Sequence, residues 1–109
     1  MRVTFLRLIM CIGLLAVAAF AQIDTGSVVG TVRDSSGAPV PKATVTLTNK
    51  ATNQTITATT NDAGEYQFNA LHAGSYSVKA VVSGFSAQEF PDVQVDVDAR
   101  VGRDFTLQV

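Results

Sequence analysis

Residues 30–45 read GTVRDSSGAPVPKATV, and residues 60–85 read TNDAGEYQFNALHAGSYSVKAVVSGF. In both stretches apolar side chains recur at every second position, and glycine or proline stands where the chain has to reverse. This alternation is typical of strands that bury one face, because successive side chains of a strand point to opposite faces. Beyond residue 21 the sequence keeps no helical period of about 3.6 residues. The two stretches therefore predict an all-β protein.

Outward from these stretches, the same alternation predicts seven short strands, at residues 27–34, 43–48, 55–60, 66–68, 74–82, 93–98 and 105–107. Strands at intervals of roughly 8–12 residues fit a two-sheet β-sandwich. The residues expected to point into its core are Val28, Gly30, Val32, Ala43, Val45, Leu47, Ile56, Ala58, Tyr66, Phe68, Tyr76, Val78, Ala80, Val82, Val93, Val95, Val97, Phe105 and Leu107, with Leu71 as a plug in the loop after the fourth strand.

Turn residues separate these strands. Residues 34–37 and 61–64 each combine a side chain that can bond its own backbone with a glycine that accepts a positive φ. Pro39 and Pro41 cannot donate a ladder hydrogen bond. We therefore expect the segment that contains them to lie at a sheet edge or outside the sheets.

The first 21 residues have the features of a secretory signal peptide. Arg2 and Arg7 accompany an apolar stretch at residues 8–20, and residues 19–21 supply the small-x-small pattern that a signal peptidase reads. The apolar stretch is shorter than the roughly 20 residues of a membrane-spanning helix. We expect cleavage after Ala21, and the alternative is an uncleaved N-terminal anchor.

The exported chain is then expected to have a flexible lead-in at residues 22–26 and one domain at residues 27–109. Cys11 leaves with the signal peptide, and Met10 before it is not the small residue of a lipidation site. The domain therefore has no disulfide and no thiolate metal site. Six basic and nine acidic residues remain, a net charge of −3, which argues against the clustered positive charge of a nucleic-acid-binding protein.

Over residues 25–109, this sequence resembles the carboxypeptidase regulatory-like domain. The stretches 30–45 and 60–85 follow the family's two recurrent segments, because the glycine, proline and aromatic positions agree. The resemblance implies a seven-stranded two-sheet sandwich of the transthyretin (prealbumin) type, which is a carbohydrate-binding-like fold. It also implies no activity of its own, since in metal-dependent carboxypeptidases this domain contributes no catalytic residue.

The position of the domain directly after a signal peptide resembles a second context. Large TonB-dependent, Oar-like outer-membrane receptors carry such a domain as an N-terminal extension in the periplasm. The resemblance implies an exported protein that is periplasmic, associated with the outer membrane or secreted. No plug or barrel strands follow Val109, so we expect either a stand-alone accessory domain, a spacer or docking module, or the leading piece of such a receptor.

Residues that could carry chemistry are few. His72 is the only histidine, and zinc sites need three or four ligands, so we interpret it as an exposed loop residue. Asp92, Asp96 and Asp98, with Asp104 nearby, lack the spacing of a calcium loop, and we interpret Asp96 and Asp98 as the solvated face of a strand. No nucleophile elbow is present. We expect no catalytic residue, no metal site and no cofactor.

A carbohydrate-binding module is the alternative function, because starch-binding-like domains share this architecture and a shared fold leaves function open. Tyr66, Phe68 and Tyr76 are in phase with aliphatic inward positions, so core packing accounts for them. Phe85 and Phe90 flank a loop, and we expect them to be the most exposed aromatic residues. They are the candidate contacts for a ligand, either a glycan or a protein of the cell envelope.

Overall fold

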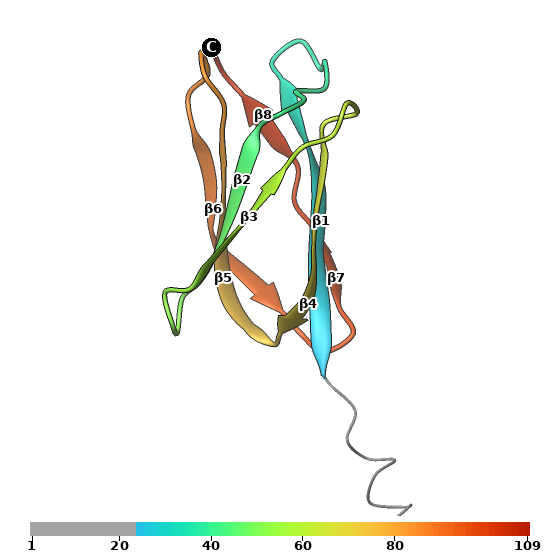
Figure 1. Ribbon diagram of the computed structural model, residues 1–109, viewed down its shortest axis with the longest axis vertical. Helices are drawn as coiled ribbons and strands as arrows, with labels where there is room; N and C mark the ends of the chain where they lie inside the picture. Colours follow the sequence, from blue (N-terminus) through green and yellow to red (C-terminus); the bar gives the residue numbers. More distant parts are fainter. Residues whose placement is uncertain (1–23) are drawn as a thin grey trace, which may run out of the picture.

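The computed structural model describes residues 24–109 and contains two four-stranded sheets packed face to face (Figure 1). The strands are β1 (Thr25–Asp34), β2 (Thr44–Asn49), β3 (Thr55–Thr59), β4 (Glu65–His72), β5 (Gly74–Val81), β6 (Gln88–Val95), β7 (Arg100–Gly102) and β8 (Phe105–Leu107). None of residues 24–109 is helical, so this part of the chain holds no apolar helix that could cross a bilayer. The signal peptide and its cleavage site lie outside the described residues and stay predictions.

One sheet is built around β1. Strand β4 pairs antiparallel with one side of β1, while β7 and β8 pair parallel with the other side. The other sheet has the order β3-β2-β5-β6, with every pair antiparallel. Because β1 lies in one sheet and β2 to β3 in the other, the prolines fall on the crossover between them. Pro39 and Pro41 both lie outside the strands, as predicted, and Pro39 makes only an isolated bridge with Arg33.

Strands β7 and β8 pair with successive parts of β1 along the same side, and Arg103 and Asp104 separate the two strands. At the break the Arg103 N–H donates to the Val29 carbonyl at 2.9 Å. The next N–H of β1 on this side belongs to Thr31, and it donates to a carboxylate oxygen of Asp104 at 3.0 Å. The same oxygen accepts a hydrogen bond from the Thr31 hydroxyl at 3.1 Å. A side chain thus replaces the backbone acceptor that a continuous strand would supply, and the N–H keeps a partner.

The core lies between the two sheets and takes inward side chains from both. Its buried apolar residues are Val28, Val32, Val40, Ala43, Val45, Leu47, Tyr66, Phe68, Leu71, Tyr76, Val78, Ala80, Val93, Val95, Phe105 and Leu107. Full burial of one such Phe or Leu side chain stabilises the fold by about 1.5–3 kcal/mol. The predicted sandwich and the inward face of most strands are therefore confirmed.

The predicted turn at residues 34–37 is held by the Asp34 side chain. One carboxylate oxygen accepts the N–H of Ser36 at 2.9 Å and the N–H of Ala38 at 3.0 Å. The hydrogen bond from the Ser36 hydroxyl is the largest of the effects that lower the pKa of Asp34, and these backbone N–H groups add to it. Gly37 completes the turn at φ 87°, where a residue with a Cβ would be strained.

Four details differ from the prediction. There are eight strands and not seven, because the three-residue β7 was missed. Leu71 is buried as expected, but it lies in β4 and not in a loop. Ile56 is 51% exposed, because β3 is an edge strand with no further strand on its outer side in the described chain. Val97 is 48% exposed, because β6 ends at Val95 and the chain turns before reaching it.

Candidate functional site

Phe85 and Phe90 are the least buried aromatic residues of the described chain, as the sequence predicts, but neither is freely exposed. Both are partly buried and pack against the core. Phe90 lies in β6 with its ring centroid 4.9 Å from that of Phe105 at an interplanar angle of 55°, a contact between aromatic rings that adds to core stability. The two residues do not form an open aromatic platform. Their proposed contact with a glycan or protein stays a prediction.

His72 is exposed at the end of β4, as expected, but in a strand and not in a loop. Its carbonyl oxygen accepts a hydrogen bond from the Tyr76 hydroxyl at 2.6 Å. Its side chain borders a cavity of about 110 Å³ whose apolar lining includes Leu47, Ile56 and Leu71. Within residues 24–109, no three histidine, cysteine or acidic side chains come together as a metal site would require.

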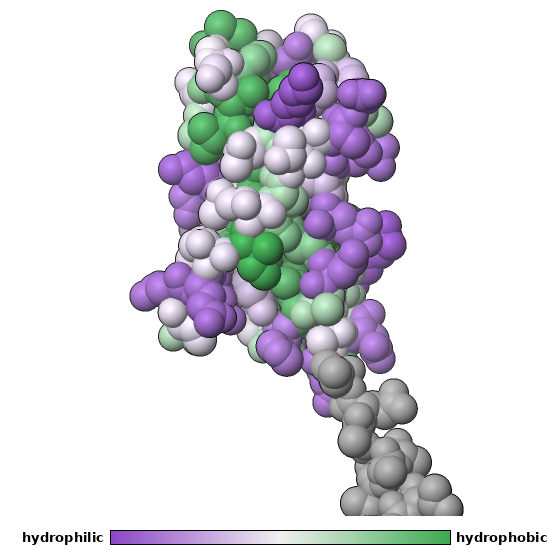
Figure 2. All heavy atoms as spheres, viewed as in Figure 1, coloured by the Kyte–Doolittle hydropathy of each residue, from purple (hydrophilic) through white to green (hydrophobic). Residues whose placement is uncertain are grey.

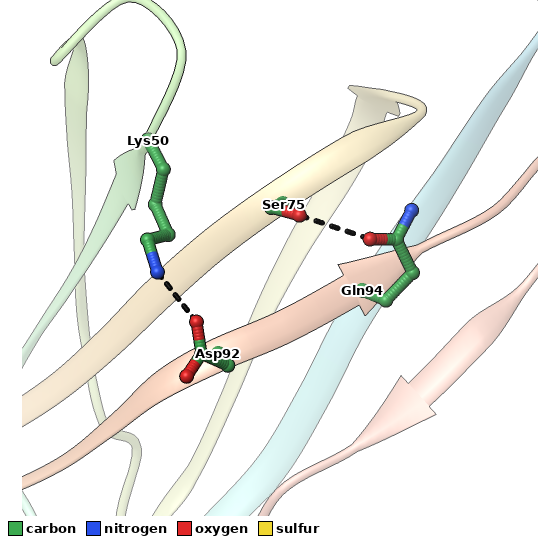
Figure 3. Close-up of polar contacts among 4 residues, drawn as sticks. All are labelled: Lys50, Ser75, Asp92 and Gln94. Carbon is green, nitrogen blue, oxygen red and sulfur yellow. Dashed lines mark hydrogen bonds and ion pairs between the residues drawn. The ribbon is translucent and has the colours of Figure 1, made fainter.

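The acidic residues grouped in the sequence are apart in the structure. Asp92 on β6 forms an ion pair with Lys50, which lies just after β2 (Figure 3). Asp104 lies in the other sheet, at the break between β7 and β8, where it is bonded to Thr31 of β1. Asp96 and Asp98 lie in the turn after β6 and not on the outward face of a strand, which corrects the prediction. Their exposed positions agree with solvated residues and not with converging calcium ligands.

The outer face of the sheet around β5 and β6 is bridged by polar side chains. Figure 3 shows the Ser75 hydroxyl on β5 pointing to the Gln94 side chain on β6, with which it bonds at 2.9 Å. The Lys50–Asp92 pair lies on the same face, and both of its side chains are well exposed. Exposed pairs of this kind contribute about 0.2–1 kcal/mol or less. The Ser75–Gln94 bond joins the neighbouring strands β5 and β6, and the Lys50–Asp92 pair reaches from the end of β2 across β5 to β6.

Tyr66 is the titratable residue most affected by its surroundings. Its hydroxyl donates to the Arg103 carbonyl at the break between β7 and β8. Burial raises the pKa of the Tyr66 phenol well above its ordinary value, and the negative charge of Asp104 raises it further. The phenol is therefore neutral at physiological pH and acts as a structural hydrogen-bond donor.

An open groove of about 440 Å³ is larger than the cavity beside His72. It is lined by Val29, Gly30, Thr31, Ala58, Thr59, Asn61, Glu65, Tyr66, Gln67 and Arg100. Amide, carboxylate, hydroxyl and guanidinium groups from four strands and a turn thus border one space. They can bind a polar ligand by hydrogen bonds.

A second surface lies along the outer edge of β3. Four of the five residues of β3 are exposed, and β2 is its only partner strand in the described chain. Figure 2 shows apolar atoms along the middle of the face on which β3 and β4 lie in Figure 1, with hydrophilic side chains on both sides. Ile56 of β3 is exposed and borders the cavity of about 110 Å³. This edge was not predicted from the sequence, although the absence of charge in residues 51–61 is a signal for it.

Residues 27–108 match the carboxypeptidase regulatory-like domain, and this match spans nearly all of the described fold. The chain belongs to that family. The resemblance of the two sequence stretches to the family is thereby confirmed. No curated protein matches the chain.

Solved structures with the same sandwich come from proteins of very different kinds. A candidate carbohydrate-binding protein from Bacteroides uniformis is 22% identical with a TM-score of 0.62, over 77% of this chain and 41% of that one. The minor pilin of Streptococcus agalactiae is 18% identical with a TM-score of 0.67, over 78% and 44%. Catechol 1,2-dioxygenase from Acinetobacter sp. is 11% identical with a TM-score of 0.62, over 82% and 54%.

These identities show the fold alone. This carboxypeptidase regulatory-like domain spans less than half of the carbohydrate-binding protein and of the pilin, and about half of the dioxygenase. The function of the domain therefore has to be argued from its own surfaces.

Proposed function

We propose that this protein is a non-catalytic, exported interaction domain of the cell envelope, a spacer or docking module. The observation that supports it best is that the two side chains with shifted pKa values, Tyr66 and Asp34, are both engaged in hydrogen bonds to the backbone of the domain. Tyr66 donates to a backbone carbonyl and Asp34 accepts from a turn, so both stabilise the chain. The other candidates for chemistry, His72 and the acidic residues, lie apart. Membership in a family of regulatory-like domains supports the same function.

The test is turnover by the purified chain that begins at Gln22. Peptidase, esterase and dioxygenase substrates should all remain unchanged beyond the rate of a buffer control. Turnover that disappears when one side chain, such as His72, is replaced would overturn the proposal. The His72→Gln variant keeps polarity at that site and serves as the matched replacement.

The envelope location is the finer part of the proposal. It is supported by the predicted signal peptide and by the position of the domain directly after it, which resembles the N-terminal extension of TonB-dependent receptors. Fractionation of cells should find the chain in the periplasm or with the outer membrane, cut before Gln22. Reading the DNA after the Val109 codon distinguishes a stand-alone domain from the leading piece of a receptor, because a plug and barrel would follow in the second case.

Carbohydrate binding is the second candidate, and the open groove of about 440 Å³ favours it. Sugars are bound by planar polar side chains such as Asn61, Glu65 and Gln67, which border this groove. A glycan array with three variants separates the possible sites. Loss of binding in Gln67→Ala assigns it to the groove, whereas loss in Phe85→Ala or Phe90→Ala assigns it to the aromatic residues. No binding by the unaltered chain at millimolar glycan eliminates this candidate.

A further inference from the structure

Each sheet has two edges, and three of these four edges carry a feature that blocks further strand pairing. Strand β6 has Pro91, which lacks a backbone donor, beside the charged Asp92. The β7–β8 edge is interrupted where the Asp104 side chain enters the ladder. Strand β4 has Ala70 in the left-handed region at φ 54°, which breaks its extended geometry. Such features prevent edge-to-edge association in natural sheets.

The edge formed by β3 has none of them. The strand reads TITAT, and residues 51–61 contain no charge, no proline and no glycine. All of β3 keeps an unbroken register with β2, without a bulge. A regular, uncharged and exposed edge is one that accepts another strand.

The backbone groups of alternate β3 residues point to the open side. The Asn49 N–H donates to the Gln54 carbonyl at 2.8 Å, and the Thr60 N–H donates to the Ala43 carbonyl at 3.0 Å. In an antiparallel ladder such bonded positions recur at every second residue, so the even-numbered residues bond to β2. The N–H and C=O groups of Thr55, Thr57 and Thr59 therefore face away from β2. Within residues 24–109 they have no backbone partner.

We propose that β3 pairs antiparallel with β3 of a second copy of this chain, about a two-fold axis at Thr57. Thr57 then lies opposite Thr57 of the partner subunit, Thr55 lies opposite the partner's Thr59, and Ile56 lies opposite the partner's Ala58. The three free residues of each strand supply about six hydrogen bonds. The two β3-containing sheets become one sheet of eight strands.

A second copy fits this edge for two reasons. The segment is nearly symmetric about Thr57, so threonine meets threonine and the two apolar residues meet each other. It is also uncharged over its whole length, so an identical strand brings no like charges together. Pairing covers Ile56, which is otherwise 51% exposed beside an apolar cavity. This inference rests on the proposed function and names a partner for the interaction domain.

Sedimentation velocity of the chain that begins at Gln22, which contains every described strand, measures the dimer. The interface is small, so we expect a dissociation constant on the order of tens of micromolar. Thr57→Lys places two ammonium groups across the axis and should weaken the dimer at least about tenfold. Thr57→Glu should do the same. An equimolar mixture of the two variants should restore dimers, because opposite charges then meet at the axis.

Gln108→Lys is the matched control, since it adds the same charge on an exposed residue just after β8, in the other sheet, and should leave the dimer unchanged. Unaltered melting curves of all variants show that the fold is kept. A chain that stays monomeric up to about 500 µM overturns the inference, even if β3 captures an extended peptide from another protein. A dimer that Thr57→Lys does not weaken also overturns it. Either result leaves the turnover test of the proposed function unaffected.

Discussion

Tyr66, Gly30 and Arg103 form one interlocked contact in the sheet around β1. A Cβ on Gly30 would lie 1.7 Å from the Arg103 carbonyl oxygen and 2.7 Å from the Tyr66 hydroxyl oxygen. The absent side chain therefore leaves room for the phenol to reach the carbonyl to which it donates. The glycine and the tyrosine, separated by 36 positions in the sequence, thus meet at the break between β7 and β8 and hold this edge against β1.

The Tyr66 phenol makes stability fall at alkaline pH. Burial raises the pKa of the folded phenol above its unfolded value of about 10. Its contribution is therefore complete below about pH 10 and is lost as the pH rises above that value, when the unfolded phenol ionises and the folded one cannot. Urea unfolding between about pH 8 and pH 11 should show this decline. Tyr66→Phe should flatten it; an unchanged decline in this variant would assign the effect elsewhere.

Gly30→Ala should be strongly destabilising, because its methyl group meets backbone atoms that cannot rotate away. We expect a loss of about 3 kcal/mol in the free energy of unfolding, as for other overpacked sites. Gly102→Ala is the matched control, since a Cβ there has no atom within 4 Å. Equal denaturation midpoints for the two variants would contradict the account of the Gly30 contact.

Phe68→Ala should cost about 3–5 kcal/mol, because it leaves a cavity in the centre of the core. The ring is 4% exposed and meets Tyr66 edge-on, with centroids 5.9 Å apart. Differential scanning calorimetry should record a melting temperature lower by many degrees, and Asn69→Ala, at the next and exposed position of β4, should change it little. A shift of a degree or two in Phe68→Ala would contradict its place in the core.

At the scale of elements, the break between β7 and β8 depends on one carboxylate. Asp104→Ala removes the acceptor of the Thr31 N–H, and an exposed bond of this kind is worth about 1 kcal/mol. Hydrogen exchange should show faster exchange of the Thr31 amide, while the Val32 amide, bonded to the Gly64 carbonyl at 2.7 Å, should be less affected. Asp104→Asn keeps an acceptor oxygen and should retain most of the protection.

The long alternating segments were predictable because periodicity and burial agree in them. Val28 and Val32, or Tyr76 and Val78, lie in strands with many apolar residues in phase, and they are buried as predicted. Strand β7 was not predictable in this way. Its only apolar residue is Val101, and it is a strand because β1 lies beside it. Local sequence does not contain the position of that neighbour.

Edge positions explain the remaining errors in the fold and in the candidate site. Strand β3 alternates like β2, yet Ile56 is exposed because burial depends on what covers a strand as well as on its pattern. The same holds for Phe85 and Phe90, whose partial burial comes from the packing of distant elements. Which backbone groups remain unpaired is a property of the sheet order, and a one-dimensional pattern does not show it.

At the scale of the whole molecule, the last strand, β8, pairs with the first strand, β1, and contributes two buried side chains to the core. A chain that stops at Asp104 lacks Phe105 and Leu107, both fully buried, and leaves the last three residues of β1 without their parallel partner. Such a chain should fail to fold as a unit, with circular dichroism lacking a cooperative thermal transition. Removal of Val109 alone, which is 92% exposed, should leave the transition intact. A cooperative transition in the shorter chain would show that β8 is dispensable.

The parallel pairing of β1 with β8 also has a consequence during synthesis. A ribosome delivers β1 long before Phe105 and Leu107, so Val28 and Val32 of the nascent chain have no complete core to enter. The growing polypeptide stays open until almost all of it has emerged. For the export proposed above, this order of synthesis would favour an unfolded precursor, which is the form that a translocation channel accepts.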